Sequence, residues 1–152
     1  MPEIIIALDN IRSHHNVGSI FRSADAFRIK EVILGGITPC PPHRDIQKTA
    51  LGATLTVAWR HELDLEKVLL SMRAQGIELI SVEQCADSVD IGHFSLEKDK
   101  KYCLIFGNEV DGVSPNILGI SGKSIEIPQM GQKKSLNVSV CAGIVMFYFR
   151  GA

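Results

Sequence analysis

The sequence predicts an α/β fold, in which helices flank a mostly parallel sheet. Short, continuous apolar runs of strand length recur along the chain, and such runs are typical of strands that are covered on both faces. Segments with helical periodicity or helix-capping signals alternate with these runs. Hydrophobic residues make up 45% of the 152 residues, and the chain contains neither a recognisable linker nor a repeat. We therefore expect one domain over residues 1–152, with any ligand at the carboxyl ends of the strands.

The amino-terminal part of the chain predicts a strand, a loop, a helix and a second strand. The run EIIIAL predicts a buried strand over Glu3–Leu8, and the polar stretch Asp9–His15 predicts a loop. A helix is expected over Asn16–Phe27, because helical rotation places four apolar side chains within one narrow face. These side chains are Val17, Ile20, Phe21 and Ala24. The run EVILGG over Glu31–Gly36 predicts the second buried strand.

The middle of the chain predicts a loop, a strand, a helix and another strand. Three prolines in TPCPPHRD indicate a loop over Thr38–Asp45. The alternating, β-branched run TLTVAW predicts a strand over Thr54–Trp59. The segment Asp64–Gly76 opens on a capping residue and closes on glycine, which predicts a helix. The run IELISV predicts the next strand over Ile77–Val82.

Two strands and two helices are expected in the carboxyl-terminal part. The run YCLIFG predicts a fully buried strand over Tyr102–Gly107, and a short helix is expected to begin at Pro115. The run KSIEIP predicts a last strand over Lys123–Pro128, which the proline stops. The segment Leu136–Phe149 is too long and too apolar for an edge strand, so it predicts a terminal helix. Because this helix is apolar almost all round, we expect part of it to pack against a partner subunit.

Charge and cysteine usage exclude several classes of function. The formal net charge is −1, so a site for an anion has to be local rather than a property of the whole surface. The four cysteines contain no CxxC pair, and we expect no metal site. Cys103 and Cys141 lie in apolar runs and are expected in the core. We find neither a secretory leader nor an apolar run of transmembrane length, so we expect a cytoplasmic protein without membrane contact.

The common nucleotide and hydrolase motifs are missing. The sequence contains no GxxxxGK[ST] and no GxSxG, and the turn after the first strand reads DNIRSHHNVG rather than GxGxxG. His14 and His15 are adjacent, so they do not face one ligand, and the other histidines are scattered. We interpret the histidines as structural or surface residues.

Three loops combine glycine or proline with polar residues, and each follows a buried strand directly or nearly. They span Asn10–Gly18, Gly107–Ser114 and Pro128–Asn137. Glycines let the backbone approach a ligand closely, and unpaired main-chain groups then bind it. Glu109 is interpreted either as a cap for the short helix or as a group of a site. Arg22 lies roughly 140° from the apolar face of its helix, and helix geometry alone favours a solvated arginine paired with Asp25.

At these loops the sequence resembles the SpoU/TrmH group of RNA ribose 2′-O-methyltransferases. The stretch NVGSIFRSAD at residues 16–25 is similar to the first motif of this family, and FGNEVDGV at residues 106–113 is similar to the second. The third is similar to IPQMGQKKSLNVS at residues 127–139. All three occur in order and after buried strands, so together they form a specific signature that spans nearly the whole chain.

The resemblance implies a parallel α/β domain with a deep trefoil knot near its carboxyl terminus. It also implies that the knot binds S-adenosylmethionine, that the protein is an obligate homodimer, and that RNA binds across the dimer interface. The stretch EQCADSVDI at residues 83–91 is similar to members that methylate a guanosine ribose in the tRNA D-loop, which favours tRNA over ribosomal RNA. Since the first strand begins at Glu3 and the last helix runs to Arg150, we expect the catalytic domain without an added RNA-binding segment.

The resemblance also assigns roles to individual residues. Those expected to act in catalysis are Arg22, Asn16, Glu109, Ser135 and Asn137. Those expected to bind the cofactor are Gln84, Gly107, Asn108, Ile127, Pro128, Met130 and Leu136. Those expected to bind RNA are Arg12, Arg22, Arg44, Lys133 and Lys134. An arginine stays protonated in ordinary settings, so for Arg22 we favour stabilisation of negative charge on the 2′-oxygen over a role as general base.

Other functions stay open at this point. Within the enzyme class, a ribosomal RNA 2′-O-methyltransferase is the alternative substrate assignment. A second class is an RNA-binding protein that keeps the fold without the chemistry, although the presence of Arg22, Glu109, Ser135 and Asn137 favours an enzyme. A third is a small-ligand domain of the flavodoxin type, which would need a phosphate-binding loop after the first strand.

Overall fold

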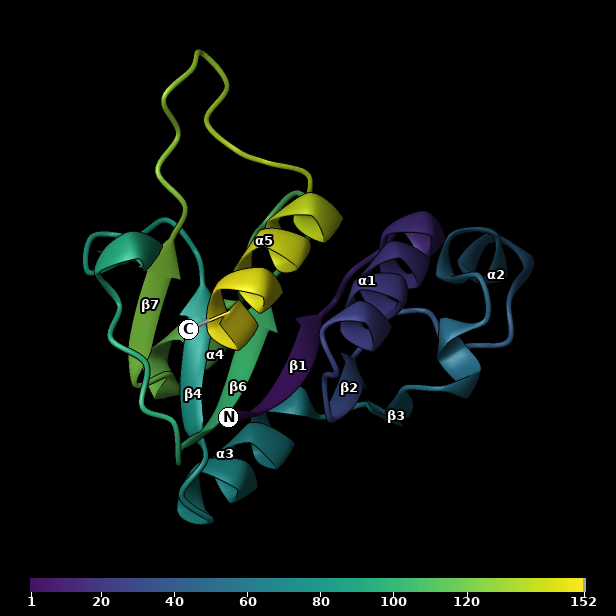
Figure 1. Ribbon diagram of the computed structural model, residues 1–152, viewed down its shortest axis with the longest axis horizontal. Coiled ribbons are helices and arrows are strands. Elements are labelled where there is room, and N and C mark those ends of the chain that lie inside the picture. The colour runs from purple at the N-terminus through teal and green to yellow at the C-terminus, as the bar shows by residue number, and fades with distance from the viewer. Residues whose placement is uncertain (152) are drawn as a thin grey trace.

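The computed structural model describes residues 1–151, and a parallel sheet of seven strands forms the centre of this part of the chain (Figure 1). The strand order is β3-β2-β1-β6-β4-β7-β5, and every pairing is parallel. The strands are β1 (Glu3–Asp9), β2 (Glu31–Gly35), β3 (Ala58–Glu62), β4 (Glu78–Val82), β5 (Val89–Asp90), β6 (Lys101–Phe106) and β7 (Lys123–Glu126). The helices are α1 (His14–Ala26), α2 (Arg44–Ala50), α3 (Leu65–Ala74), α4 (Pro115–Ile120) and α5 (Val138–Gly151).

Helices cover both faces of the sheet, which confirms the predicted α/β class. Side chains of α1, α2 and α5 form one buried cluster with one face of the strands, and α3 and α4 form a second cluster with the other face. Strand β1 contributes to both clusters in alternation, with Ile4 and Ile6 on the first face and Ile5 and Ala7 on the second. This double burial explains why the predicted strand reads as a continuous apolar run.

Helix α1 begins at His14, two residues before the predicted start. The Ser13 side chain accepts a hydrogen bond from the backbone N–H of Asn16 at 3.2 Å, so Ser13 is the residue that caps the helix. The predicted apolar face is confirmed, because Val17, Ile20, Phe21 and Ala24 are all buried. The predicted loop over Asp9–His15 is therefore three residues too long, since Asp9 belongs to β1 and the last two residues belong to α1.

Helix α2 is an element that the sequence analysis missed. The prolines of TPCPPHRD do form a loop, but the predicted loop is too long because its last two residues already belong to α2. Helices α1 and α2 lie in close contact at Gly18, where a Cβ atom would collide with the Thr49 hydroxyl and the Ile46 carbonyl oxygen. Thr49 Oγ1 also donates a hydrogen bond to the backbone carbonyl of His15 at 2.9 Å.

The strand predicted over Thr54–Trp59 is displaced, and only its last two residues belong to β3. Residues Ala53–Leu55 form a single 3₁₀ turn, and β3 begins later, at Ala58. Thr54 is buried in this turn, where it shares a side-chain hydrogen bond with Gln47 of α2. Strand β3 pairs only with β2 among the described residues, and an edge strand needs no continuous apolar run.

The remaining predicted elements are found with shifts at their ends. Asp64 caps α3 by accepting a hydrogen bond from the N–H of Lys67 at 3.1 Å, and Gly76 follows that helix with a φ of +86°. Helix α5 begins two residues later than predicted and ends at Gly151, and the last predicted strand ends two residues earlier, at Glu126. Among residues 1–151, none of the helices is both long and apolar enough to span a membrane.

The guanidinium of Arg150 fastens the end of α5 to the rest of the domain. It donates hydrogen bonds to the carbonyl oxygens of Phe27 and Arg28, just after α1, and of Pro2, just before β1. Figure 1 shows α5 and α1 in front of the sheet, with the long loop that precedes α5 rising above the strand ends. This packing sets the position of the loop relative to α1.

Candidate functional site

A cavity of about 480 Å³ lies at the carboxyl ends of β4, β6 and β7. Its walls come from the residues that end or follow these strands and from the loop that leads into α5. The lining residues are Val82, Glu83, Gln84, Phe106, Gly107, Asn108, Glu109, Val110, Gly112, Ile125, Glu126, Ile127, Gln129, Ser135, Leu136, Asn137, Val138 and Cys141. The position agrees with the expectation that a parallel sheet binds ligands at this edge.

Glu109 joins the loop after β6 to the start of α1. Its carboxylate accepts hydrogen bonds from the backbone N–H groups of Arg12 at 3.0 Å and Ser13 at 3.1 Å, and from the Asn16 side-chain amide at 3.2 Å. Burial raises the pKa of Glu109, but these hydrogen bonds outweigh it and hold the pKa below its usual range. Glu109 therefore holds the residues that lead into α1, beside the Ser13 cap, rather than capping the short α4, and it does so as an ionised group.

Asn16 and Asn137 extend this connection to the loop before α5. The Asn137 amide donates a hydrogen bond to Asn16 Oδ1 at 3.1 Å, while Asn16 donates to Glu109. Asn137 Oδ1 in turn accepts from the backbone N–H of Ser139 at 2.9 Å and caps the first turn of α5. One chain of side-chain contacts thus links all three loops that stood out in the sequence.

The loop after β6 is held rigidly against its neighbours. Asn108 Oδ1 accepts from the backbone N–H of Val110 at 2.8 Å, and Asn108 Nδ2 donates to the carbonyl of Asn10 at 2.6 Å. Gly107 lies so close to the returning chain that a Cβ atom there would collide with the backbone of Gly112 and Val113. This close approach explains why a glycine ends the predicted strand.

The cavity carries negative charge. Its lining includes the carboxylates of Glu83, Glu109 and Glu126, and none of its described lining residues is a lysine, arginine or histidine. Glu83 accepts a hydrogen bond from the backbone N–H of Val113 at 2.8 Å, and Glu126 accepts one from the Ser88 hydroxyl at 2.5 Å. Such a lining favours a ligand with positive charge.

Cys141 also lines the cavity. It is half-buried and packs against the edge of the core, and Cys103 is fully buried as expected. Burial raises the pKa of the Cys141 thiol to about 11. The thiol is therefore neutral near pH 7 and adds no charge to the cavity.

The structure brings most of the expected site residues together. The cavity lining includes Gln84, Gly107, Asn108, Glu109, Ile127, Ser135, Leu136 and Asn137, and Asn16 contacts two of them. Pro128 and Met130 lie outside the lining, and Met130 is 95% exposed on the loop. The sequence analysis missed Glu83 and Glu126, although Glu83 directly follows β4 and Glu126 ends β7 at the ligand-binding edge of the sheet.

Arg22 is exposed on α1 and lies outside the cavity lining. Within residues 1–151 its side chain makes neither a hydrogen bond nor an ion pair. Asp25 instead accepts a hydrogen bond from the Thr56 hydroxyl at 2.6 Å, so the expected pairing of Arg22 with Asp25 is wrong. The other basic residues expected to bind RNA are also exposed, namely Arg12, Arg44, Lys133 and Lys134.

Next to Arg22, α1 and α5 present an apolar surface hollow. Its lining residues are Ser19, Ser23, Phe27, Ser139, Val140, Gly143, Ile144 and Phe147. Phe147 is 64% exposed and Val140 is 52% exposed. Exposed apolar side chains gathered in this way are typical of a surface that contacts another protein.

The sequence of residues 3–147 matches the SpoU rRNA Methylase family. The chain is 30% identical over 151 residues to a tRNA (guanosine(18)-2'-O)-methyltransferase of Aquifex aeolicus, with 95% of this chain and 67% of that protein covered. It is 30% identical over 145 residues to the 23S rRNA (guanosine-2'-O-)-methyltransferase RlmB of Neisseria meningitidis, with 95% of this chain and 57% of that protein covered.

The fold is similar to that of an AdoMet-bound rRNA methyltransferase from Sinorhizobium meliloti, with a TM-score of 0.91 and 30% identity. That alignment covers 98% of this chain and 56% of the other. The chain thus spans between about half and two thirds of the length of these three proteins. Since the family match extends over nearly all of the sequence and includes the three connected loops, the chain belongs to the SpoU rRNA methylase family.

Proposed function

We propose that this chain transfers a methyl group from S-adenosylmethionine to a ribose 2′-OH of RNA. The observation that carries the proposal is the contact chain from Glu109 through Asn16 to Asn137. It unites the three family motifs beside one cavity at the carboxyl edge of the sheet. The relatives named above are RNA methyltransferases, which supports the same reaction class.

The cavity suits S-adenosylmethionine in size and in charge. A volume of about 480 Å³ falls within the range of about 300–1,000 Å³ that is usual for small-molecule sites. When bound, the cofactor supplies a methyl group on a positively charged sulfur, and three carboxylates favour that charge. Residues proposed to hold it are Gln84, Gly107, Asn108, Ile127 and Leu136, with Pro128 and Met130 on the loop that passes above.

Arg22 is the residue proposed to act on the 2′-oxygen. A guanidinium stays protonated and donates hydrogen bonds in a fixed fork, so it pairs with phosphate and stabilises negative charge that develops on the oxygen. Asn16 and Glu109 position the start of the same helix. Ser135 and Asn137 line the cavity and are proposed to orient the ribose.

A homodimer is part of this proposal. The apolar hollow between α1 and α5 is the proposed contact surface, and Arg22 lies at its edge, between Ser19 and Ser23 along the helix. Because Arg22 does not line the cavity of its own chain, we propose that it acts at the cavity of its partner. The RNA would then contact both protomers.

Transfer RNA is the favoured substrate. The stretch at residues 83–91 supports it, and so does the similarity to a tRNA (guanosine(18)-2'-O)-methyltransferase. The similarity to a 23S rRNA methyltransferase supports ribosomal RNA as the alternative. Exposed basic residues proposed to contact the RNA are Arg12, Arg44, Lys133 and Lys134.

We also propose that the carboxyl-terminal part of this single domain forms a deep trefoil knot. The order β6-β4-β7 and the return of α5 to the side of α1 support such a path. Tracing of residues 78–151 in an experimental density map would test it. A cytoplasmic location is proposed as well, since the four cysteines are free thiols, as suits a reducing compartment.

The experiment combines the purified protein with radiolabelled S-adenosylmethionine and, separately, with unmodified total tRNA and unmodified ribosomal RNA. Label on a ribose 2′-oxygen in the tRNA pool supports the proposal in full. Label in the ribosomal RNA pool would mean that ribosomal RNA, and not tRNA, is the substrate. Cofactor binding without label in either pool supports the non-catalytic RNA-binding alternative. If neither binding nor label is found, the proposed function is wrong.

A further inference from the structure

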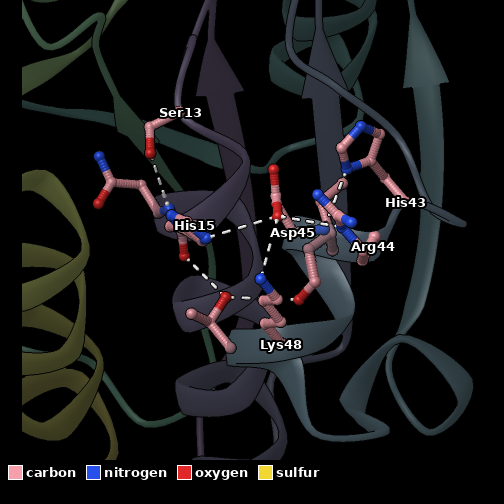
Figure 2. A network of polar contacts seen from close by, with 9 residues as sticks. Ser13, His15, His43, Arg44, Asp45 and Lys48 are labelled. Atoms are coloured by element: carbon pink, nitrogen blue, oxygen red, sulfur yellow. Dashed lines mark hydrogen bonds and ion pairs between the residues drawn. The ribbon is translucent and has the colours of Figure 1, made fainter.

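Beyond the cavity, the described surface carries a cluster of basic residues where the first turns of α1 and α2 meet. We name it the α1–α2 corner, and it comprises His14, His15, His43, Arg44, Asp45 and Lys48. Figure 2 shows Asp45 at the centre of its polar contacts, with His15, Arg44 and Lys48 directed toward the same carboxylate. The proposed chemistry at the cavity assigns no role to the histidines.

The corner has more positive than negative groups. The Asp45 carboxylate lies 3.8 Å from His15, 3.9 Å from Arg44 and 3.8 Å from Lys48, so three basic side chains share one acid. These are long contacts between exposed groups, because the Arg44 side chain is 84% exposed and that of Lys48 is 60% exposed. Exposed pairs of this kind are weak, so the cationic groups can exchange Asp45 for another anion at little cost.

Two imidazole rings lie against each other in the same corner. The ring centroids of His14 and His43 are 4.0 Å apart, and the rings are tilted by 37°. Nδ1 of His43 accepts a hydrogen bond from the backbone N–H of Asp45 at 3.1 Å, which leaves Nε2 as the N–H donor of that ring. Imidazole and guanidinium groups are surfaces on which RNA bases stack, and they also donate to phosphate.

The corner is fixed to the proposed active site. Ser13 and Asn16, on the first turn of α1, contact Glu109 at the cavity, and His14 and His15 lie between them in the sequence. Helix α2 packs directly against α1 at Gly18, which sets its position beside the first turn of α1. A polyanion that crosses the start of α1 to reach the cavity therefore meets this surface.

We propose that the α1–α2 corner is a docking surface for the phosphate backbone of RNA, and that the His14–His43 pair forms part of that surface. This inference rests on the proposed function, since it assumes an RNA substrate. The charged groups next to the pair are Arg44, Asp45 and Lys48 from α2, with Glu109 from the loop after β6 on the other side of the first turn of α1.

The first test measures the affinity for a fluorescently labelled, unmodified tRNA transcript at several salt concentrations. For the double variant Arg44→Ala/Lys48→Ala we expect about tenfold weaker binding at 0.1 M salt and a shallower dependence on salt, by roughly one unit of slope per lost contact. The matched control is Lys67→Ala/Arg73→Ala on α3, at the opposite face of the sheet, for which we expect little change. Equal affinity of the corner variant and the wild type overturns the proposal.

The second test addresses the histidines. The double variant His14→Gln/His43→Asn removes both imidazole rings, while asparagine keeps an acceptor for the first turn of α2. We expect its affinity for tRNA to fall about threefold, because the rings no longer stack on bases or donate to phosphate. His93→Gln, at the exposed end of the turn Ile91–His93, is the control and should behave as the wild type. An affinity equal to that of the wild type overturns the role of the pair.

The cofactor separates failure of this inference from failure of the proposed function. Each variant is also titrated with S-adenosylmethionine by calorimetry, and all should bind it as the wild type does, because the corner lies outside the cavity lining. If both corner variants bind the cofactor, methylate RNA and bind tRNA as the wild type does, the docking proposal is wrong and the proposed function stands. If the wild-type protein binds neither the cofactor nor tRNA, both proposals are wrong.

Discussion

The cavity and the α1–α2 corner have opposite charge, although both contact the first turn of α1. The cavity is lined by Glu83, Glu109 and Glu126 without a basic side chain among its described lining residues. The corner offers the cationic side chains of Arg44 and Lys48, and three histidines, near the single carboxylate of Asp45. The formal net charge of −1 conceals this separation completely. Net charge is therefore a poor guide to the partners of a small domain whose charges are segregated.

The separation matches the two reactants that the proposed function requires. A sulfonium cofactor is positive at the reacting centre and RNA is negative along its backbone, so each region repels the ligand of the other. The backbone N–H groups of Arg12 and Ser13 bind Glu109 on the cavity side, while the neighbouring histidines belong to the corner. The two regions are thereby held at a fixed spacing by one helical turn.

The largest effect is expected for Arg22→Ala, which removes a positive group that belongs to neither region. We expect turnover to fall about 100-fold or more, because one donor to a developing negative charge is commonly worth that much. The affinity for S-adenosylmethionine should not change, since Arg22 lies outside the cavity lining of its chain. Single-turnover methylation and calorimetry measure the two quantities.

Two variants control this measurement. Arg22→Lys keeps the charge without the guanidinium fork and should recover only part of the activity. Lys67→Ala, on the far side of the sheet, should leave turnover unchanged. Near-normal turnover of Arg22→Ala would mean that Arg22 is a solvated surface residue without a role in catalysis.

The second prediction concerns Gly107→Ala, a substitution that disrupts the cavity and leaves the corner intact. In Gly107→Ala the new Cβ collides with the backbone of Gly112 and Val113, so the loop after β6 has to shift. We expect the affinity for S-adenosylmethionine to fall about 30-fold or more, because the displaced loop supplies several groups of the lining. Binding of the tRNA transcript should change by less than about twofold.

Gly119→Ala is the matched control for that variant. A Cβ at Gly119 meets no other atom within 4 Å, and the residue lies in α4, away from the cavity. Cofactor binding should therefore stay normal. Parallel loss of cofactor and tRNA binding in Gly107→Ala would show that the two regions are not independent.

The sequence predicts those features of the domain that depend on neighbouring residues. The apolar face of α1, the cap at Asp64 and the buried strands β1 and β6 all follow from local patterns. Helix α2 was missed because the prolines before Arg44 conceal its start, and the run at Thr54 has strand propensity that packing beneath α1 overrides. In both cases tertiary contacts decide the structure.

The site shows the same limit more sharply. Glu109 accepts hydrogen bonds from residues 96 and 97 positions earlier, so its role at the start of α1 cannot be recognised from any local pattern. Glu83 and Glu126 can be recognised as site residues only when β4 and β7 are known to be neighbours, with their carboxyl ends at the cavity. The motifs indicate the three loops, but only the fold shows the charge that these loops enclose.

A third, smaller effect tests whether the negative charge of the cavity selects the charged cofactor. In Glu126→Gln the shape of the lining is nearly kept and one charge is lost. We expect the affinity for S-adenosylmethionine to fall about fivefold, and that for S-adenosylhomocysteine, whose sulfur is neutral, to change less than twofold. Calorimetric titration of both compounds gives the ratio. Glu66→Gln on α3 is the control, and an equal loss for both compounds would assign Glu126 to shape or hydrogen bonding rather than to charge.

The smallest effect concerns Glu109, the carboxylate that joins the two regions. Its pKa is lower in the folded chain than in the unfolded chain, where glutamate titrates at about 4.3, so the ionised form stabilises the fold. This contribution is complete above the unfolded value and is lost as pH falls through the lower, folded value. Because the group is partly exposed to solvent, we expect Glu109→Gln to lower the free energy of unfolding at pH 7 by only about 1 kcal/mol or less. Denaturant titrations at pH 7 and pH 3.5 should show the wild-type advantage shrinking at the lower pH, whereas an advantage independent of pH would mean that Glu109 joins the two regions by its shape and not by its charge.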